Sequence, residues 1–162
     1  IAENCLTQVL SDTHLSRIQE ANQTNSLAQL SIYNDGFATK VAQSLPTPIF
    51  SIIAGNAIAC KETINAYDTI VISLFVPKAK PMNQFEIETE VLQFIGKLLA
   101  TKNCVLYVFG NPYALQVIPN LALAKEIVMA YQDFEVFQDA AAQQLVHNLP
   151  CSGLLPVFIK NI

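Results

Sequence analysis

Apolar residues in this chain gather in short runs of strand length, and amphipathic segments lie between these runs. Each run has apolar side chains at consecutive positions and many β-branched or aromatic residues, which is typical of strands buried on both faces. The predicted strands are Leu27–Tyr33, Ile49–Ile53, Thr69–Val76, Cys104–Phe109, Ile127–Tyr131 and Leu154–Ile159.

Helical periodicity marks the segments that connect these runs, because apolar residues recur there at spacings of three and four. Strands that alternate with helices pair in parallel through right-handed crossovers. The predicted fold class is therefore α/β: a three-layer αβα sandwich around a mostly parallel sheet, of flavodoxin-like or related strand order. The predicted helices are one after Asn34–Gly36 that carries Phe37, Val41 and Leu45, a short one at Ala57–Ala66, one from Glu86 to Leu99, and Phe134–Asn148.

The first 26 residues follow another pattern. Apolar positions in Ile1–Leu10 recur every four residues, which predicts an amphipathic helix. Ser11–Ser26 is polar and predicts a loop, with a turn of helix around Leu15 and Ile18. We therefore expect residues 1–26 to be an N-terminal helix and linker from a preceding domain, and residues 27–162 to be the sandwich domain. Because the chain begins within an apolar pattern, we expect a fragment of a longer protein.

Composition narrows the classes of partner. Hydrophobic residues make up 52% of the 162 residues and charged residues only 14%. A sheet covered on both faces and a surface covered by another domain explain this equally well. The net charge is −4 and Arg17 is the only arginine, which argues against nucleic acids and anionic membranes as partners. No apolar run reaches the length of a membrane span.

The four cysteines lie far apart in the sequence and lack metal-ligand spacing. We interpret them as small buried apolar residues, with the three disulfide pairings of an oxidising compartment as the alternative. They leave the cellular compartment open. The four are Cys5, Cys60, Cys104 and Cys151.

Motifs of cofactor and nucleophile sites are missing from the sequence. It has no glycine-rich dinucleotide or phosphate loop and no nucleophile elbow, so we expect no cofactor and no metal. His14 and His147 have no nucleophile beside them and are interpreted as surface or capping residues. Carboxylates near strand ends are candidates for a glycosidase acid pair, but a place in a first helical turn explains them sufficiently. They are Asp35, Glu86, Asp133 and Glu135.

The strand Cys104–Phe109 runs directly into Gly110–Pro112, a rigid polar turn. Such strand-end loops are where open α/β sheets place ligand or partner contacts. Val108–Leu115, which reads VFGNPYAL, resembles the V-L-F-G-N-P-Y-A-L segment of the C-terminal domains of glycoside hydrolase family 3, of the β-N-acetylhexosaminidase type found in Bacteroidetes-like bacteria.

Three further segments are similar to motifs of this family, and the resemblance covers about Leu27–Ile159. One departure stands at Leu145–Pro150, where the family's glycine is lost, which implies an altered helix end. The similar segments are Tyr67–Ser73 to Y-D-x-V-I-x-S, Ala130–Leu145 to A-Y-x-D … Q-x-x-A-A-Q-x-L, and Pro150–Val157 to P-x-S-G-x-L-P-V.

The resemblance implies a preceding TIM barrel that carries the nucleophilic Asp and a His/Asp acid–base pair, so no residue of this chain is expected to be catalytic. The parent would release terminal N-acetylglucosamine-type sugars with retention of the anomeric configuration. We expect the parent to be a periplasmic or secreted bacterial protein. This domain would pack on the barrel, stabilise it and border the sugar cleft.

If the domain contacts sugar, the expected substrate-binding residues are Asn111, Tyr113, Gln132 and Asp133, whose amide, phenol and carboxylate groups suit hydroxyl partners. The structural alternative is that Asn111 and Pro112 only build the turn and Tyr113 packs against it. Two other functions stay open at this point: a stand-alone module that binds a small ligand at the strand ends, and a purely structural or dimerising domain.

Overall fold

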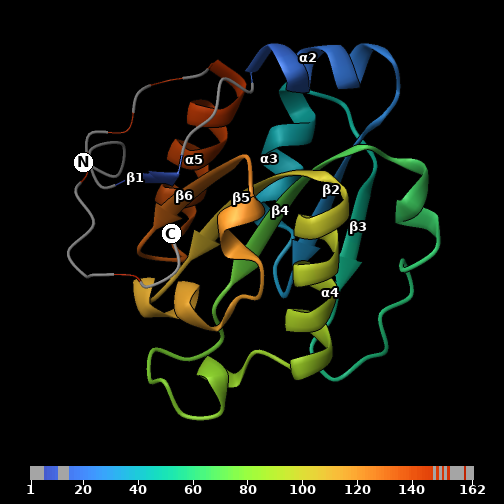
Figure 1. Ribbon diagram of the computed structural model, residues 1–162. Coiled ribbons are helices and arrows are strands. Elements are labelled where there is room, and N and C mark those ends of the chain that lie inside the picture. The colour runs from blue at the N-terminus through green and yellow to red at the C-terminus, as the bar shows by residue number, and fades with distance from the viewer. Residues whose placement is uncertain are drawn as a thin grey trace.

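A six-stranded sheet in the order β1-β6-β5-β4-β2-β3 forms the centre of the molecule (Figure 1). The computed structural model describes residues 6–10, 15–147, 149, 151, 153 and 159. Five strands are parallel, and β1 pairs antiparallel with β6. Counted from β2, the parallel strands follow the order 2-1-3-4-5 of flavodoxin-like folds, which confirms the predicted fold class. The strands are β1 (Thr7–Leu10), β2 (Leu27–Ile32), β3 (Ile49–Ile52), β4 (Thr69–Phe75), β5 (Asn103–Phe109) and β6 (Glu126–Ala130).

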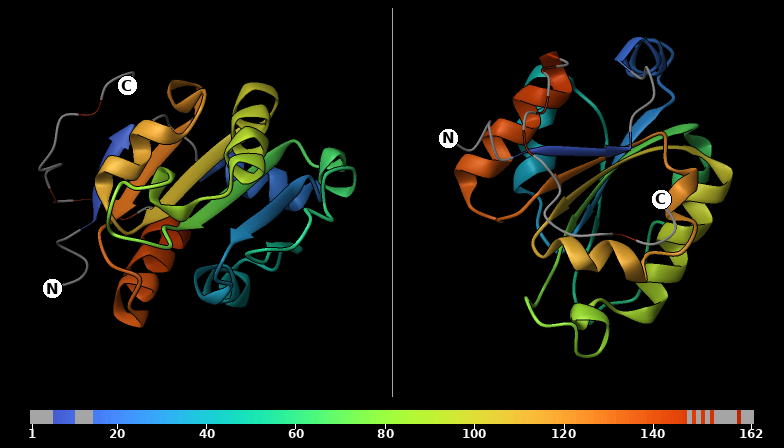
Figure 2. Two further views of the ribbon diagram at one scale, coloured as in Figure 1. Left: turned by 90° about the horizontal axis from the view of Figure 1, so that it is seen from below. Right: turned by 60° about the vertical axis from the view of Figure 1, so that its left-hand side comes forward.

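Helices cover both faces of the sheet and give it three layers, as the views in Figure 2 show. One face carries α2 (Leu15–Gln23), α3 (Gly36–Ser44) and α5 (Glu135–His147). The other carries α4 (Thr89–Thr101) and four short 3₁₀ turns. These turns are η1 (Thr63–Ala66), η2 (Gln84–Glu86), η3 (Pro112–Val117) and η4 (Leu121–Leu123).

The core lies in two apolar layers because successive strand residues point to opposite faces of the sheet. Under α3, the ring of Phe37 lies 4.8 Å from that of Tyr107 and 5.5 Å from that of Phe109. Phe75 stacks on Phe109 with the ring centres 4.3 Å apart. On the other face, α4 buries the apolar stripe that its periodicity predicts, with Ile95 fully buried.

The structure corrects the prediction for the N-terminal segment. Thr7–Leu10 is a strand, so the helix predicted over Ile1–Leu10 is wrong there, and residues 1–5 lie outside the described residues. This strand, β1, pairs with β6, which lies far away in the sequence, and Gln8 Nε2 donates to Glu126 Oε1 at 2.7 Å. The predicted linker contains a full helix at Leu15–Gln23, which extends the single turn expected there. A connection from this segment to a preceding domain stays a prediction.

Two further predicted elements differ from the structure. Of the short helix at Ala57–Ala66 only η1 forms, because a loop without regular structure follows Gly55, which has a φ of 80°. The helix predicted from Glu86 begins at Thr89, since residues 83–86 all have positive φ. The predicted strand Leu154–Ile159 lies outside the described residues apart from Ile159, which is buried. In the described part of the chain no helix has the length and apolar character needed to cross a membrane.

Candidate functional site

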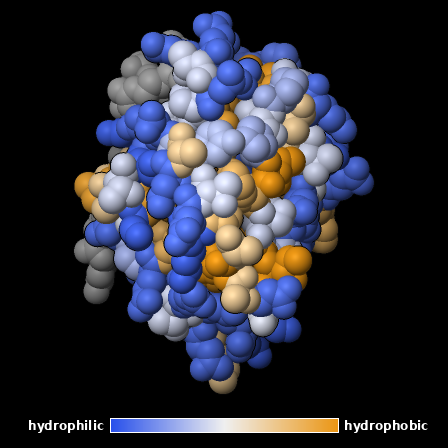
Figure 3. Space-filling model, turned by 90° about the vertical axis from the view of Figure 1, so that its right-hand side faces the viewer, coloured by the Kyte–Doolittle hydropathy of each residue, from blue (hydrophilic) through white to orange (hydrophobic). Residues whose placement is uncertain are grey.

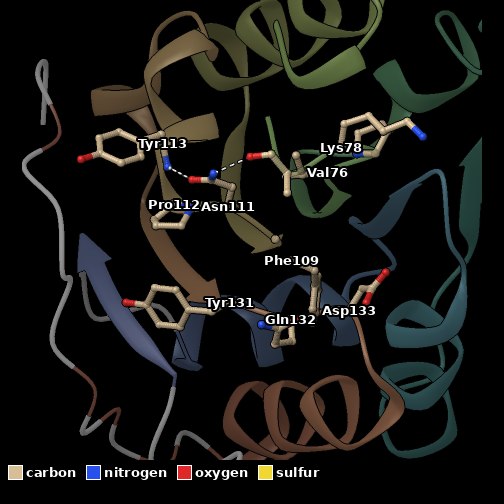
Figure 4. A pocket seen from close by; sticks show the side chains of 12 residues that line it. Val76, Lys78, Phe109, Asn111, Pro112, Tyr113, Tyr131, Gln132 and Asp133 are labelled. Atoms are coloured by element: carbon tan, nitrogen blue, oxygen red, sulfur yellow. Dashed lines mark hydrogen bonds between the residues drawn. The ribbon is translucent and has the colours of Figure 1, made fainter. Parts of the chain in front are cut away.

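A pocket of about 590 Å³ opens at the carboxyl ends of β4, β5 and β6 (Figure 4). All four residues predicted to contact a ligand line it: Asn111, Tyr113, Gln132 and Asp133. The first pair follows β5 and the second follows β6, so the parallel sheet brings together two segments that are separate in the sequence. Whether these residues bind sugar stays a prediction.

The turn after β5 is built by Gly110 and Asn111. Gly110 has a φ of 134°, and a Cβ atom at this position would lie 2.8 Å from the Cβ atom of Val76. Glycine is therefore required both by the backbone angle and by the close approach of β4. Asn111 accepts a hydrogen bond from the N–H of Tyr113 at 2.9 Å and donates from Nδ2 to the C=O of Ala79 at 2.7 Å. Its amide thus fastens two loops together.

The loop between β4 and α4 forms one wall of the pocket and contributes Lys78. The N–H of Lys78 donates to the C=O of Phe85 at 3.3 Å, and the side chain of Phe85 is buried. This part of the loop has four successive residues in the left-handed region, Asn83 to Glu86. Such a run is costly for residues with a Cβ atom. Lys78 was not among the predicted site residues, because a lysine in a Pro-rich loop looks like an ordinary surface residue in the sequence.

The segment after β6 forms the opposite wall. The hydroxyl of Tyr131 donates to Thr7 Oγ1 at 2.7 Å, so β1 holds this ring in place. Gln138 of α5 donates from Nε2 to the C=O of Asp133 at 2.8 Å, which fixes the backbone beside the pocket. In Figure 4 the rings of Tyr113 and Tyr131 lie on one side of the view, and Lys78 and Asp133 lie on the other.

The pocket is lined by two side-chain amides, one carboxylate, one ammonium group and three aromatic rings. These are groups that bind hydroxyl-rich ligands. Asp133 is the one carboxylate that lines it, whereas hydrolysis of a glycosidic bond by the usual route takes two. No three His, Cys, Asp or Glu residues in the described segments lie close enough together to hold a metal ion.

Open α/β sheets form a ligand crevice where the strand order reverses, which here is between the ends of β2 and β4. Hydrogen bonds between Tyr33, directly after β2, and Glu88, directly before α4, lie beside this point. Tyr33, with a φ of 73°, places its hydroxyl within 3.3 Å of Glu88 Oε1 and accepts from the N–H of Glu88 at 3.1 Å. Burial of this ring raises the pKa of the Tyr33 hydroxyl. Glu88 Oε1 also accepts from the N–H of Gly55 at 3.1 Å. The pocket described above therefore lies beyond this crevice, towards β6.

The other carboxylate candidates have structural partners. Asp35, in the N-cap position of α3, accepts hydrogen bonds from the hydroxyls of Ser31 and Ser51 rather than from the helix. Glu135, in the first turn of α5, lies 3.2 Å from Lys40 Nζ. Glu86 accepts from Asn83 Nδ2 at 3.3 Å. None of the three lines the pocket.

The histidines and cysteines do not contribute to the pocket either. His147 lies at the exposed C-terminal end of α5, and His14 and Cys5 are outside the described residues. Cys60, Cys104 and Cys151 are free thiols. Burial raises the pKa of Cys104 to about 12, which makes this thiol inert at neutral pH.

Comparisons with known proteins identify the fold. Searches of protein-family models and of curated proteins find no match. Solved structures do match, with a fungal multi-domain GH3 β-N-acetylglucosaminidase at a TM-score of 0.72 and 18% identity, over 99% of this chain and 18% of that chain. A glycoside hydrolase family 3 β-N-acetylglucosaminidase from Paenibacillus sp. str. FPU-7 matches at a TM-score of 0.68 and 12% identity, over 96% of this chain and 30% of that chain. The β-glucoside phosphorylase BglX matches at a TM-score of 0.65 and 13% identity, over 94% of this chain and 29% of that chain.

This chain has the fold of a region of glycoside hydrolase family 3 proteins. It spans less than a third of the length of each of these three structures. The three are therefore much longer proteins in which this fold is one part.

Proposed function

We propose that this chain is the accessory α/β sandwich domain of a family 3 glycoside hydrolase of the β-N-acetylhexosaminidase type. In this proposal the domain packs on a catalytic TIM barrel of the same polypeptide, stabilises it, and borders its sugar cleft with the pocket at β4–β6. The observation that carries the proposal is the convergence of polar strand-end residues in a single pocket within this fold.

The fold and its place in longer proteins support the accessory role. The likeness extends over nearly the whole chain, and two of the matched proteins are β-N-acetylglucosaminidases. The motif VFGNPYAL, on which the resemblance to this branch rests, forms the end of β5 and the turn that builds the pocket. The same residues thus support the branch and the location of the site.

Exposed apolar side chains around the pocket support a large neighbour. Tyr113 is 46% exposed, and Phe134, directly after Asp133, is 61% exposed. Val136, in the first turn of α5, and Met82, in the loop after β4, are exposed as well. We call these four residues the rim. Apolar side chains gathered at one edge of a molecule are typical of an interface that another domain covers.

The pocket residues divide into two roles. Both the oxygen and the nitrogen of the Asn111 amide form hydrogen bonds with backbone groups, so we propose that this residue positions the pocket rather than the ligand. Tyr113, Gln132, Asp133 and Lys78 are exposed and remain able to contact a sugar hydroxyl or amide. Bond cleavage is assigned to the barrel, because the pocket alone supplies a single carboxylate.

Steady-state hydrolysis of an aryl N-acetyl-β-glucosaminide by the full-length parent tests the proposal. Phe134→Asp places a charge in the proposed interface and is expected to lower kcat/KM about tenfold, the effect of losing a contact of about 1–2 kcal/mol. Leu123→Asp, at an apolar residue that is 51% exposed and does not line the pocket, is the matched control and should leave kcat/KM unchanged. Equal activity of both variants would refute the rim contact.

The sugar contact has a test of its own. Titration of N-acetylglucosamine into the chain, followed by NMR, should shift the amide signals of Tyr113 and Asp133 and leave those of η4 unchanged. If no signal shifts at N-acetylglucosamine concentrations that nearly saturate the active full-length parent, only the scaffold role remains for this domain. The rival function, a stand-alone module that binds a small ligand at the strand ends, would then need a ligand other than this sugar.

A further inference from the structure

The strand β3 is an open edge of the sheet. In the described part of the chain it pairs only with β2. The N–H groups of Gln29 in β2 and of Tyr33 directly after β2 donate to the C=O groups of Pro48 and Ile52, each at 2.9 Å. Alternate residues of a strand bond to the same neighbour, so the backbone groups of Ser51 point the other way. An open row of N–H and C=O groups is a template for another strand.

This edge lacks the charges that usually prevent such pairing. Residues 41–60 contain no Asp, Glu, Lys or Arg. The flanking cations are already engaged, since Lys40 lies 2.8 Å from Asp139 and Lys61 lies 2.5 Å from Glu90. Figure 3 looks onto the side of the molecule where β3 lies, and apolar residues gather across its middle and lower right.

Side chains at the edge are apolar or carry a hydroxyl. Ile53, directly after β3, is 62% exposed, and Ile49 and Phe50 are half-buried. The nearest charge is Asp35, whose carboxylate accepts from the hydroxyls of Ser31 and Ser51 and therefore lies towards β2. The side chains of residues 49–53 themselves are uncharged, so none of them would meet a like charge of a second strand across a two-fold axis.

From these observations we propose that β3 pairs antiparallel with β3 of a second copy of this chain, with the two-fold axis at Ser51. In this register Ser51 faces Ser51 and exchanges two N–H···O=C bonds with it, and Ile49 of each copy faces Ile53 of the other. An isologous contact needs a surface that is compatible with itself, and an uncharged apolar strand meets this condition. The two sheets join into one continuous twelve-stranded sheet, 6 + 6 from the two copies.

The proposal does not depend on the proposed hydrolase function, because β3 and the pocket lie at different strands of the sheet. The rim contact and the β3 contact therefore have separate variants. A failure of one proposal leaves the other standing.

Sedimentation velocity of the chain over a range of concentrations tests the pairing. We expect a concentration-dependent species of twice the monomer mass, which Ile53→Lys abolishes because each copy would bury an ammonium group against Ile49 of the other. Leu123→Lys, at a residue 51% exposed and away from β3, is the control and should leave the dimer intact. At a concentration where the parent chain is monomeric, thermal melts of both variants should match that of the parent chain, since both sites are exposed.

Hydrogen exchange locates the contact. The amide of Ser51 should exchange at least about tenfold more slowly at concentrations where the dimer forms than in the monomer. A chain that stays monomeric, a dimer that survives Ile53→Lys, or a Ser51 amide without added protection in the dimer would each overturn the proposal. Protection of Ser51 that arises only within a monomeric full-length parent would assign the edge to another part of that protein, and would also overturn it.

Discussion

At Asn111 both ends of the side-chain amide bind the chain's own backbone, one on Tyr113 and one on Ala79. Asn111→Ala removes both bonds and frees the loop after β4. We expect the chain to lose about 1–3 kcal/mol of stability, and the amides of Lys78 and Ala79 to exchange faster. Chemical denaturation and hydrogen exchange measure the two effects. Asn65→Ala, at an exposed asparagine, is the control. Unchanged exchange at Lys78 would contradict the fastening role.

Gly110 is the second residue on which the pocket depends. Gly110→Ala forces a Cβ atom into a backbone angle of positive φ and against Val76, and neither strain can relax without moving β4 or the turn. We expect a loss of about 1–3 kcal/mol in the free energy of unfolding. Gly55→Ala is the matched control, because it has positive φ but open space around it. A loss no larger than that of Gly55→Ala would show that the contact with Val76 does not matter.

Buried thiols make the stability of the fold fall at high pH. The pKa of Cys104 rises from an ordinary 9.0 to about 12 in the fold. The protonated thiol of Cys104 therefore contributes fully to the stability of the fold below pH 9.0. This contribution is lost as the pH rises towards about 12, since only the unfolded chain releases the proton in that window. The slope reaches at most about 1.4 kcal/mol per pH unit. Between about pH 8 and 11, the free energy of unfolding should decline less steeply with pH in Cys104→Ala than in the native chain. Parallel declines would contradict this.

The sequence predicts those polar residues of the pocket that directly follow a strand whose end is marked in the sequence. Gly110–Pro112 stops β5, and Gln132 and Asp133 follow an apolar run, so their place at one sheet edge follows from parallel pairing. Lys78 could not be found, because the left-handed run at Asn83–Glu86 that shapes its loop has no sequence signal. The engagement of Asn111 with Ala79 could not be found either, since it joins two loops by a tertiary contact.

Among the elements, the docking of α3 depends on one aromatic side chain. Phe37 is fully buried between α3 and the rings of Tyr107 and Phe109. Phe37→Ala should cost about 3–5 kcal/mol, because it removes a whole ring from a close-packed layer. Phe134→Ala, at an exposed ring, should change the free energy of unfolding by less than about 0.5 kcal/mol. Denaturant titrations compare the two, and similar losses would contradict the packing described for α3.

The elements that the sequence predicted well are those whose signal is local and strong. The runs at β4 and β5 are buried on both faces, so an unbroken apolar run marks them within a residue or two. β1 was mistaken for a helix because apolar residues spaced by four fit a helix, while its strand state comes from pairing with β6, more than a hundred residues away. Helix α2 has a weak signal in the sequence, because among its residues 18–23 only Ile18 and Ala21 are buried.

On the scale of the whole molecule, the pocket and the rim share the carboxyl edge of the sheet. Of the exposed apolar rim residues, Tyr113 lines the pocket and Phe134 directly follows Asp133 of its lining, and the pocket supplies one carboxylate and no second acid. A domain of this construction is suited to complete a site whose reacting groups come from a neighbour. This is the central claim for its function.

The most direct measurement of this claim is hydrolysis of an aryl N-acetyl-β-glucosaminide by three samples: this chain, the remainder of the parent protein, and the two mixed. The account predicts no turnover by this chain and faster turnover by the mixture than by the remainder alone. Turnover by this chain unaided, or a remainder that works equally well without it, would contradict the account.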